Sequence, residues 1–381
     1  LLIALYLVVA ILYLVALYLY VPTLPTYVQS KSESLALVGV ILAQYGLWQA
    51  IIRLPLGIVT DWVGRRKPFI IGGTILAGLG AWIMGTAETA GGMAVGRAVT
   101  GLAAGTWVPL TVAFSGLFPA QDAIRATAIL TFVGSIGRVA ATSVTGSLNQ
   151  LGGYSLAFFL AAGAAVLAAL VMLPAREKVH APRRPSVTGI GRLTTRRDVL
   201  LPSLLSAISH YATWAVPFGF LPILAEELGA TDVTLSALLS MHIGLVTVMT
   251  LVTAGIVTRV GARRMVLFSF ALMSGGISLA ALAPSLAMLF VAQFCLGGAQ
   301  GLSYPVMMGM SIQDVADDER ATAMGLHQSI YAIGMFTGPW LSGLLAEAVG
   351  LRSMFGVTAG VTLVAAIALI RLLPGQTRAY A

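Results

Sequence analysis

The chain alternates long apolar stretches with short polar segments. A helix needs about 20 apolar residues to cross the hydrocarbon core of a bilayer, and twelve stretches reach this length. Uninterrupted apolar runs that contain Gly and Ala favour helices, since the strands of a membrane barrel would alternate apolar and polar residues. We therefore predict an all-α membrane protein with twelve transmembrane helices. They are residues 1–21, 35–59, 68–86, 91–117, 126–150, 153–174, 199–224, 234–258, 265–283, 285–309, 321–345 and 351–373.

The second half of the chain repeats patterns of the first half at an offset of about half its length. The pairs are Gly57-Ile-Val-Thr-Asp61 with Gly255-Ile-Val-Thr-Arg259, Arg97-x3-Gly101-x3-Gly105-x3-Pro109 with Gln293-x3-Gly297-x3-Gly301-x3-Pro305, and Arg125-Ala-Thr-Ala128 with Arg320-Ala-Thr-Ala323. Repeats of this length in an apolar chain are typical of transporters built from two bundles. We expect six-helix bundles over residues 1–174 and 199–381, joined by a cytoplasmic linker over residues 175–198.

Composition and charge support a membrane location. With 58% hydrophobic and 9% charged residues, the chain has too little polar surface for a water-soluble domain. Most of the 22 Lys and Arg residues lie on one side of the predicted spans, so the positive-inside rule puts both termini in the cytoplasm. The net charge of +8 reflects this topology and contact with anionic membrane lipids, and we expect no nucleic-acid partner. We predict an integral protein of a bacterial inner membrane.

The loop motif Gly57-x3-Asp61-x2-Gly64-Arg65-Arg66-Lys67 resembles the signature between the second and third helices of the major facilitator superfamily. The Arg97-x3-Gly101-x3-Gly105 pattern is similar to the family's fourth-helix motif. Gly334-x3-Gly338-Pro339 resembles an antiporter motif that usually lies in the fifth helix. The resemblance covers essentially the whole chain and implies two pseudo-symmetric bundles around a central site. The fifth span lacks the Gly-Pro pair, which argues against the drug–proton antiporters.

The loop motif also predicts a conformational latch. Gly57 has no side chain and so lets another helix approach closely. In lipid, helices associate through such close packing, because the hydrophobic effect does not drive them together. Asp61 ends a helix, where the macrodipole repels an anion, so it needs a partner. The resemblance suggests the N-terminus of the eleventh helix, near Ala321 and Thr322. The predicted latch comprises Gly57, Asp61, Gly64, Arg65 and Arg66. The alternative is a simple helix stop with topology charges, which leaves Asp61 unexplained.

Three arginines lie inside predicted spans, whereas all fourteen carboxylates lie in loops or at span ends. Arg138 is halfway along the fifth span, and without a nearby acid we expect it to bind an anionic group of a substrate. The alternative is that it caps backbone carbonyls. Arg97 occupies a position that the resemblance links to proton coupling, and it is also a candidate for substrate binding. Arg53 is interpreted as mostly structural.

Three histidines in spans, His210, His242 and His327, are candidate proton carriers because imidazole titrates near neutral pH. A buried, hydrogen-bonded histidine is the alternative for each. The single Cys295 permits no intramolecular disulfide, and no His/Cys cluster has metal-ligand spacing. We expect no metal and no cofactor.

Aromatic and amide side chains complete the predicted binding site, although a lipid-facing position is the alternative for any single aromatic. These residues are Tyr13, Gln44, Trp107, Tyr211, Trp214, Gln300, Gln328 and Tyr331. The sequence therefore predicts a monomeric secondary transporter, not an enzyme. It would move a small organic or amphipathic solute with an anionic group, by alternating access and with proton coupling. The alternatives are efflux of neutral or cationic drugs, favoured by the Pro22 to Pro25 pattern, and a lipid flippase. Import and export remain open.

Overall fold

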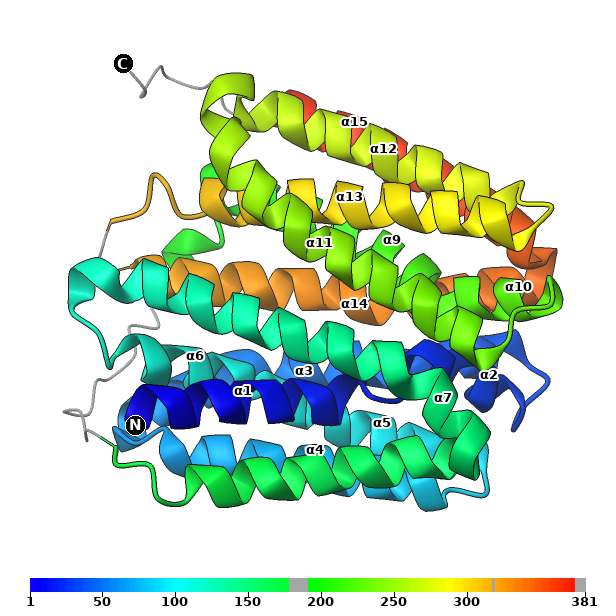
Figure 1. The fold of residues 1–381 in the computed structure, drawn as a ribbon. Helices are drawn as coiled ribbons and strands as arrows, with labels where there is room; N and C mark the ends of the chain where they lie inside the picture. Colours follow the sequence, from blue (N-terminus) through cyan, green and yellow to red (C-terminus); the bar gives the residue numbers. More distant parts are fainter. Residues whose placement is uncertain (178–190, 317–318, 374–381) are drawn as a thin grey trace.

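The computed structural model describes residues 1–177, 191–316 and 319–373, and in these ranges the regular structure is helical (Figure 1). Ten helical stretches in the described part are long and apolar enough to cross a membrane. One of them, Arg125–Met172, holds two helices, and α14 (Arg320–Val349) packs among the others. The predicted twelve-helix fold is confirmed.

The first bundle contains six membrane helices, of which the first and the fourth are interrupted and the fifth and the sixth are merged in α7. Its elements are α1 (Leu2–Tyr18), η1 (Val21–Thr23), α2 (Leu24–Gln29), α3 (Leu35–Val63), α4 (Lys67–Thr86), α5 (Ala90–Gly105), α6 (Trp107–Ser115), η2 (Ala120–Asp122) and α7 (Ala123–Met172). The second bundle consists of α9 (Arg197–Ala215), η3 (Val216–Phe220), α10 (Leu221–Glu227), α11 (Asp232–Val260), α12 (Ala262–Ala281), α13 (Leu286–Met310), α14 (Arg320–Val349) and α15 (Leu351–Leu372).

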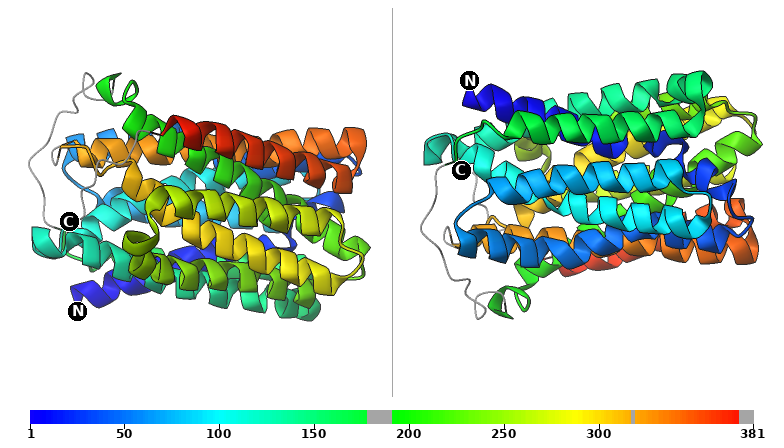
Figure 2. Two further views of the ribbon diagram at one scale, coloured as in Figure 1. Left: turned by 90° about the horizontal axis from the view of Figure 1, so that it is seen from above. Right: turned by 90° about the horizontal axis from the view of Figure 1, so that it is seen from below.

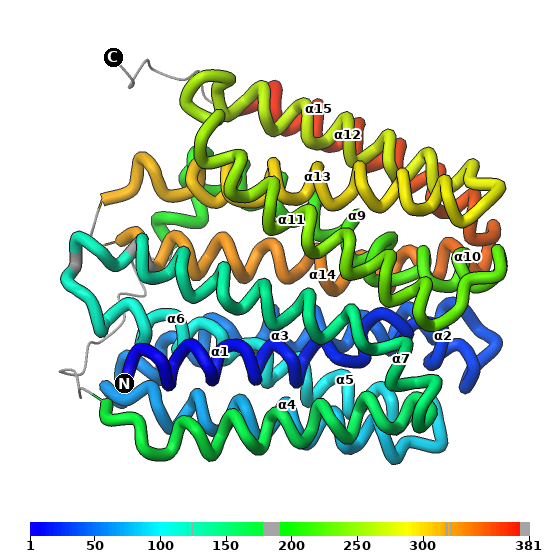
Figure 3. Tube along the Cα trace, in the orientation of Figure 1, coloured from blue at the N-terminus to red at the C-terminus, as the bar shows by residue number. Residues whose placement is uncertain are grey.

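Local sequence explains where the helices break. Gly153 has φ of +70°, which only glycine adopts without strain, and here α7 turns back on itself. Figure 3 shows the second part of α7 returning beside α4. Pro22 interrupts the first membrane helix and Pro217 interrupts the seventh, because proline lacks the amide hydrogen that continues a helix. The two breaks occupy equivalent places in the two bundles.

The packing inside the bundles repeats as well. In the first bundle, α1 and α4 each pack on α7, while α3 and α4 pack on α5. In the second bundle, α9 packs on α14, α12 on α15, and α11 and α12 on α13. Each pair has its counterpart, so the sequence repeat corresponds to a structural repeat. Residues 178–190 of the linker predicted over residues 175–198 lie outside the described residues, and so does Arg378. The bundle boundary therefore stays a prediction.

The two ends of the molecule differ in charge. We call the end that carries Arg65, Arg66, Lys67, Arg263 and Arg264 the basic end, and the end that carries Glu33, Glu226, Glu227, Asp232 and Glu347 the acidic end. The described chain begins at the basic end, and α15 returns to it (Figures 1 and 2).

The bundles meet along two helix pairs, α3 with α14 and α7 with α11. Glycines bring the backbones together: a Cβ at Gly39 would lie 2.4 Å from the Pro339 carbonyl oxygen, and a Cβ at Gly146 would lie 2.3 Å from that of Asp232. Hydroxyls also pair across the interface, Thr142 with Ser240 at 2.8 Å. These contacts lie between the middle and the acidic end, so that end is closed.

Candidate functional site

Arg97 is a buried cation without a carboxylate partner. Its side chain, on α5, is 2% exposed, and its Nε and Nη1 atoms have no hydrogen-bond partner. The guanidinium lies 4.2 Å from the ring centroid of Tyr45 on α3, a cation–π contact that offsets only part of the cost of burying the charge. An anion delivered to this position would satisfy the free donors.

Arg53 connects the two bundles. From α3 it donates to Gln49 Oε1 at 2.5 Å in its own helix, and it reaches the Gln328 carbonyl oxygen on α14 at 3.5 Å. Its guanidinium lies over the ring of Tyr331, 5.0 Å from the centroid. We interpreted Arg53 from the sequence as mostly structural. Its position between the bundles, against predicted site residues, makes it a candidate site residue instead.

Arg138 on α7 is half-buried and donates from Nη2 to Ser135 Oγ at 2.7 Å. Its Nε has no partner, and the guanidinium lies 5.6 Å from the ring of Tyr18. The described ion pairs involve other residues, so none of the three arginines is paired with a described carboxylate.

Two of the predicted histidines form one cluster in the second bundle. His210 on α9 stacks on Tyr331, with ring centroids 4.2 Å apart, and its Nδ1 donates to the Ser206 carbonyl oxygen at 2.8 Å. Tyr304 packs edge-on against both rings. Because Arg53 covers the same Tyr331, a first-bundle cation lies beside a titratable second-bundle group.

His327 is also part of this cluster, but both of its ring nitrogens are occupied. Nδ1 lies 3.0 Å from Ser203 Oγ and Nε2 lies 3.2 Å from Ser206 Oγ. Ser203 donates its own proton to the Val199 carbonyl oxygen, so Nδ1 of His327 must donate to Ser203. Ser206 then donates to Nε2. The neutral imidazole is fully satisfied.

His242 lies apart from the cluster and is fully buried. Its Nε2 is 2.9 Å from Oε1 of Gln300, while its Nδ1 has no partner. Phe218 contacts the ring edge-on. The structure therefore brings two predicted residues, His242 and Gln300, into direct contact, away from His210 and His327.

An aromatic stack crosses between the bundles. Tyr45 on α3 stacks on Trp214 on α9 at 5.2 Å, and Trp214 stacks on Phe218 at 5.0 Å. Arg97 lies against the other end of the stack, on Tyr45. Trp214 is one of the predicted site residues, and Tyr45 directly follows the predicted Gln44 on α3.

Several other predicted residues make bonds inside the protein. Tyr13 donates to the Ala103 carbonyl oxygen at 2.5 Å and stacks on Trp107, which ties α1 to the junction of α5 and α6. Gln44 bonds Trp48 within α3 at 3.2 Å, and Tyr211 accepts from Ser342 at 3.4 Å. Tyr13 therefore holds α1 against α5 and α6, and its role in binding a substrate stays a prediction.

The predicted latch is disengaged in this conformation. Asp61 is 54% exposed and pairs with Arg66 at 3.1 Å rather than with the start of α14. Outside its own helix, no atom lies within 4 Å of the position of a Cβ at Gly57, so the expected close helix approach is absent here. Gly64 ends α3 in a left-handed conformation, with φ of +67°. The approach expected at Gly57 does not occur in this conformation because α3 with α14 and α7 with α11 pack tightly toward the acidic end, whereas Gly57 lies at the basic end.

The chain matches a model of a known protein family in both of its halves. The model of the Major Facilitator Superfamily matches residues 6–208 and again residues 203–380. The chain belongs to the Major Facilitator Superfamily. The two successive matches correspond to the two bundles, and the resemblance stated from the motifs is confirmed.

Relatives in sequence are distant but cover most of the chain. An uncharacterized MFS-type transporter of Methanocaldococcus jannaschii is 18% identical over 349 residues, 90% of each chain. A chloramphenicol efflux pump of Mycobacterium tuberculosis is 24% identical over 344 residues, covering 86% of this chain and 81% of the pump. The chain is thus similar to transporters over most of its length.

Solved structures show the same fold. A mutant of the nucleoside transporter NupG aligns with a TM-score of 0.83 at 16% identity, over 98% of this chain and all of that one. A bacterial homologue of the human lysosomal transporter Spinster, inward-facing and unoccupied, aligns with a TM-score of 0.82 at 16% identity, over 97% and 96%. At this identity the likeness concerns the fold alone.

Proposed function

We propose that this member of the superfamily is a proton-coupled secondary transporter that moves a small organic or amphipathic solute with an anionic group by alternating access. The observation that carries the proposal is the set of three arginines, Arg53, Arg97 and Arg138, which lie inside the membrane fold without a described carboxylate partner. Charges at membrane depth are costly and usually serve function. A guanidinium can bind a carboxylate or phosphate through two parallel hydrogen bonds.

The conformation supports alternating access. The bundles are joined toward the acidic end. At the basic end, Asp61 is 54% exposed and pairs with Arg66 of its own bundle, and a Cβ at Gly57 would have open space among the described residues. By the positive-inside rule the basic end faces the cytoplasm, so this state is open toward the cytoplasm and closed toward the outside. In the opposite state, Asp61 would bind the start of α14 and lock the basic end.

Proton coupling is proposed to run through His210. Nδ1 of this imidazole is occupied by the Ser206 carbonyl oxygen, which leaves Nε2 to take up a proton. A protonated His210 would repel Arg53, which lies over the neighbouring Tyr331. Proton uptake in the second bundle would thereby weaken its contact with the first bundle.

A thermal-shift panel on the purified protein tests the proposal. Organic anions, sugars and cationic drugs are compared at pH 6 and pH 8 in wild type, Arg138→Gln and Arg263→Gln, the last being an exposed arginine outside the site. A ligand at about 100 times its Kd stabilises a protein by about 2.7 kcal/mol, which is measurable. We expect stabilisation by anions, lost in Arg138→Gln and kept in Arg263→Gln. Equal stabilisation in all three proteins would refute the anion site.

A second candidate function is efflux of an uncharged aromatic drug. The stack of Tyr45, Trp214 and Phe218 offers flat apolar rings, and a relative over most of the chain is a chloramphenicol efflux pump. This function predicts stabilisation by chloramphenicol that is indifferent to Arg138→Gln and lost in Trp214→Ala. Adding chloramphenicol and the Trp214→Ala variant to the panel therefore separates the two candidates.

A further inference from the structure

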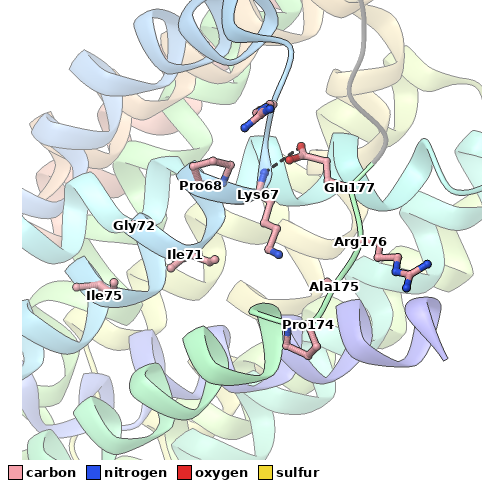
Figure 4. A pocket seen from close by; sticks show the side chains of 10 residues that line it. Lys67, Pro68, Ile71, Gly72, Ile75, Pro174, Ala175, Arg176 and Glu177 are labelled. Carbon is pink, nitrogen blue, oxygen red and sulfur yellow. Dashed lines mark hydrogen bonds between the residues drawn. The ribbon is translucent and has the colours of Figure 1, made fainter.

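A groove opens between α4 and the end of α7 at the basic end of the molecule. It has a volume of about 880 Å³ and is lined by Arg65, Lys67, Pro68, Ile71, Gly72, Ile75, Pro174, Ala175, Arg176 and Glu177. Figure 4 shows Ile71 and Ile75 of α4 on one wall, and Pro174 with Ala175 on the other. The Lys67 side chain lies between the two walls (Figure 4).

The rim of the groove has an excess of positive charge. Its three basic side chains are Arg65, Lys67 and Arg176. The one carboxylate, Glu177, accepts hydrogen bonds from the backbone amides of Arg66 and Lys67, the second at 3.0 Å. Glu177 thus serves the positive start of α4, and the three side-chain charges stay available to a ligand.

The floor of the groove is apolar and continues along the outside of the first bundle. Ile75 is 54% exposed, and two further side chains on the same side of α4, Leu79 and Trp82, are also exposed. On the second part of α7, Leu170 and Leu173 are exposed. Apolar residues that face outward from a membrane helix contact acyl chains, whereas a basic rim at the helix end lies at headgroup level.

We propose that this groove is a binding site for an anionic phospholipid of the leaflet at the basic end. The phosphate lies among Arg65, Lys67 and Arg176, and an acyl chain lies along Ile71 and Ile75. Lys67 already bonds the Leu173 carbonyl oxygen at 2.6 Å, which ties α4 to the end of α7. A bound phosphate would strengthen this link, so the lipid holds the end of the first bundle to the last residue of the loop motif. Lipid binding at this groove can be tested without the proposed solute and without a proton gradient.

Native mass spectrometry of the detergent-purified protein tests the site. Phosphatidylglycerol is added, and phosphatidylcholine with the same acyl chains is the reference. Two variants are compared: Lys67→Gln with Arg176→Gln, which removes two charges from the groove, and Arg263→Gln with Arg264→Gln, which removes two exposed charges from α12, the counterpart of α4. Each Lys or Arg near an anionic surface contributes roughly 1 kcal/mol, so we expect about tenfold or greater loss of phosphatidylglycerol in the first variant and retention in the second.

A third variant tests the apolar wall without a change of charge. A Cβ at Gly72 has open space around it, so Gly72→Phe fills the groove without disturbing the core. We expect it to lower phosphatidylglycerol binding as strongly as the charge variant. Equal loss in the α12 variant would overturn the site in favour of general electrostatic attraction. Displacement of the lipid by equimolar glycerol phosphate would also overturn the lipid assignment and show a site for soluble phosphate.

Discussion

Asn149 on α7 donates a hydrogen bond from Nδ2 to Oδ2 of Asp232 on α11, at 3.0 Å, across the interface of the two bundles. The same amide group donates to Thr23 Oγ1 at 3.0 Å, and Tyr154 donates to the other carboxylate oxygen of Asp232 at 3.3 Å. This network closes the acidic end. The proposed alternating access would require this closure to open in the opposite state.

Gly146, one turn before Asn149, sets how closely α7 and α11 approach. Its amide donates to Ser236 Oγ at 2.8 Å, and a Cβ here would lie 2.3 Å from the Asp232 carbonyl oxygen. We expect Gly146→Leu to force the acidic end open and to reduce transport more than tenfold, since a clash of this size costs about 1–3 kcal/mol or more.

The opening can be measured with spin labels at Glu33 and Glu227, both exposed and one on each bundle, in a Cys295→Ser background. The inter-label distance should lengthen in Gly146→Leu. Gly163→Leu is the matched control in the second part of α7, because a Cβ there has open space. An unchanged distance in Gly146→Leu would contradict the role of this contact.

The disengaged latch predicts that Asp61 contributes little to the stability of the present state. Asp61 is 54% exposed in its pair with Arg66, and ion pairs that reach the solvent contribute about 0–1 kcal/mol. Asp61→Asn should therefore leave the thermal midpoint nearly unchanged. It should slow transport into liposomes, because the opposite state would lose the proposed contact between the Asp61 carboxylate and the start of α14. Asp122→Asn, at the same end but outside the motif, should affect neither. A large drop in thermal stability for Asp61→Asn would indicate a structural residue.

The membrane helices and the repeat were predictable because lipid restricts the choices. Backbone groups in a bilayer must bond within their own segment, so each crossing appears as a long apolar run. The turn within α7 at Gly152 and Gly153 lies at the junction of the predicted spans 126–150 and 153–174. The break after Tyr18 was less visible, and the first helical stretch reaches Gln29 rather than residue 21.

The arrangement of the site was not predictable from one half of the chain at a time. Arg53 meets the Gln328 carbonyl oxygen 275 positions later in the chain, through an approach of α3 and α14 that depends on glycines in both helices. The charge of Arg53 is known from the sequence, but its contact with the Gln328 carbonyl oxygen is not. The same limit holds for His327, whose serine partners Ser203 and Ser206 come from another helix.

The unsatisfied state of Arg97 predicts opposite effects on stability and transport. Two of its nitrogens are buried without partners, a condition that costs several kcal/mol for a charge. Arg97→Met fills a similar volume without the charge, so it should keep or raise the thermal midpoint and yet lower transport at least about tenfold. Arg53→Met serves as the contrast, because it breaks bonds to Gln49 and Gln328 and should lower the midpoint. A lower midpoint in Arg97→Met would mean that Arg97 supports the fold.

The position of His210 predicts the sign of a pH effect. Neutral His210 stacks on Tyr331, the ring that Arg53 also contacts. A proton on Nε2 of His210 would place a second positive charge several Å from Arg53. The repulsion between the two charges is on the order of 1–2 kcal/mol at a protein-like dielectric. As pH falls, the contact between α3 and α14 weakens and the population of the state closed at the acidic end decreases. The distance between labels at Glu33 and Glu227 should therefore lengthen as the pH is lowered.

Two histidine variants separate this mechanism from a general effect of acid. His210→Gln keeps a polar side chain but removes the titrating group, so the inter-label distance should no longer depend on pH. His327→Gln disturbs an imidazole whose two nitrogens are already bonded, so it should lower thermal stability while the pH response persists. If the pH response persisted in His210→Gln and vanished in His327→Gln, the proton would bind at His327, and the repulsion of Arg53 would not be the coupling step.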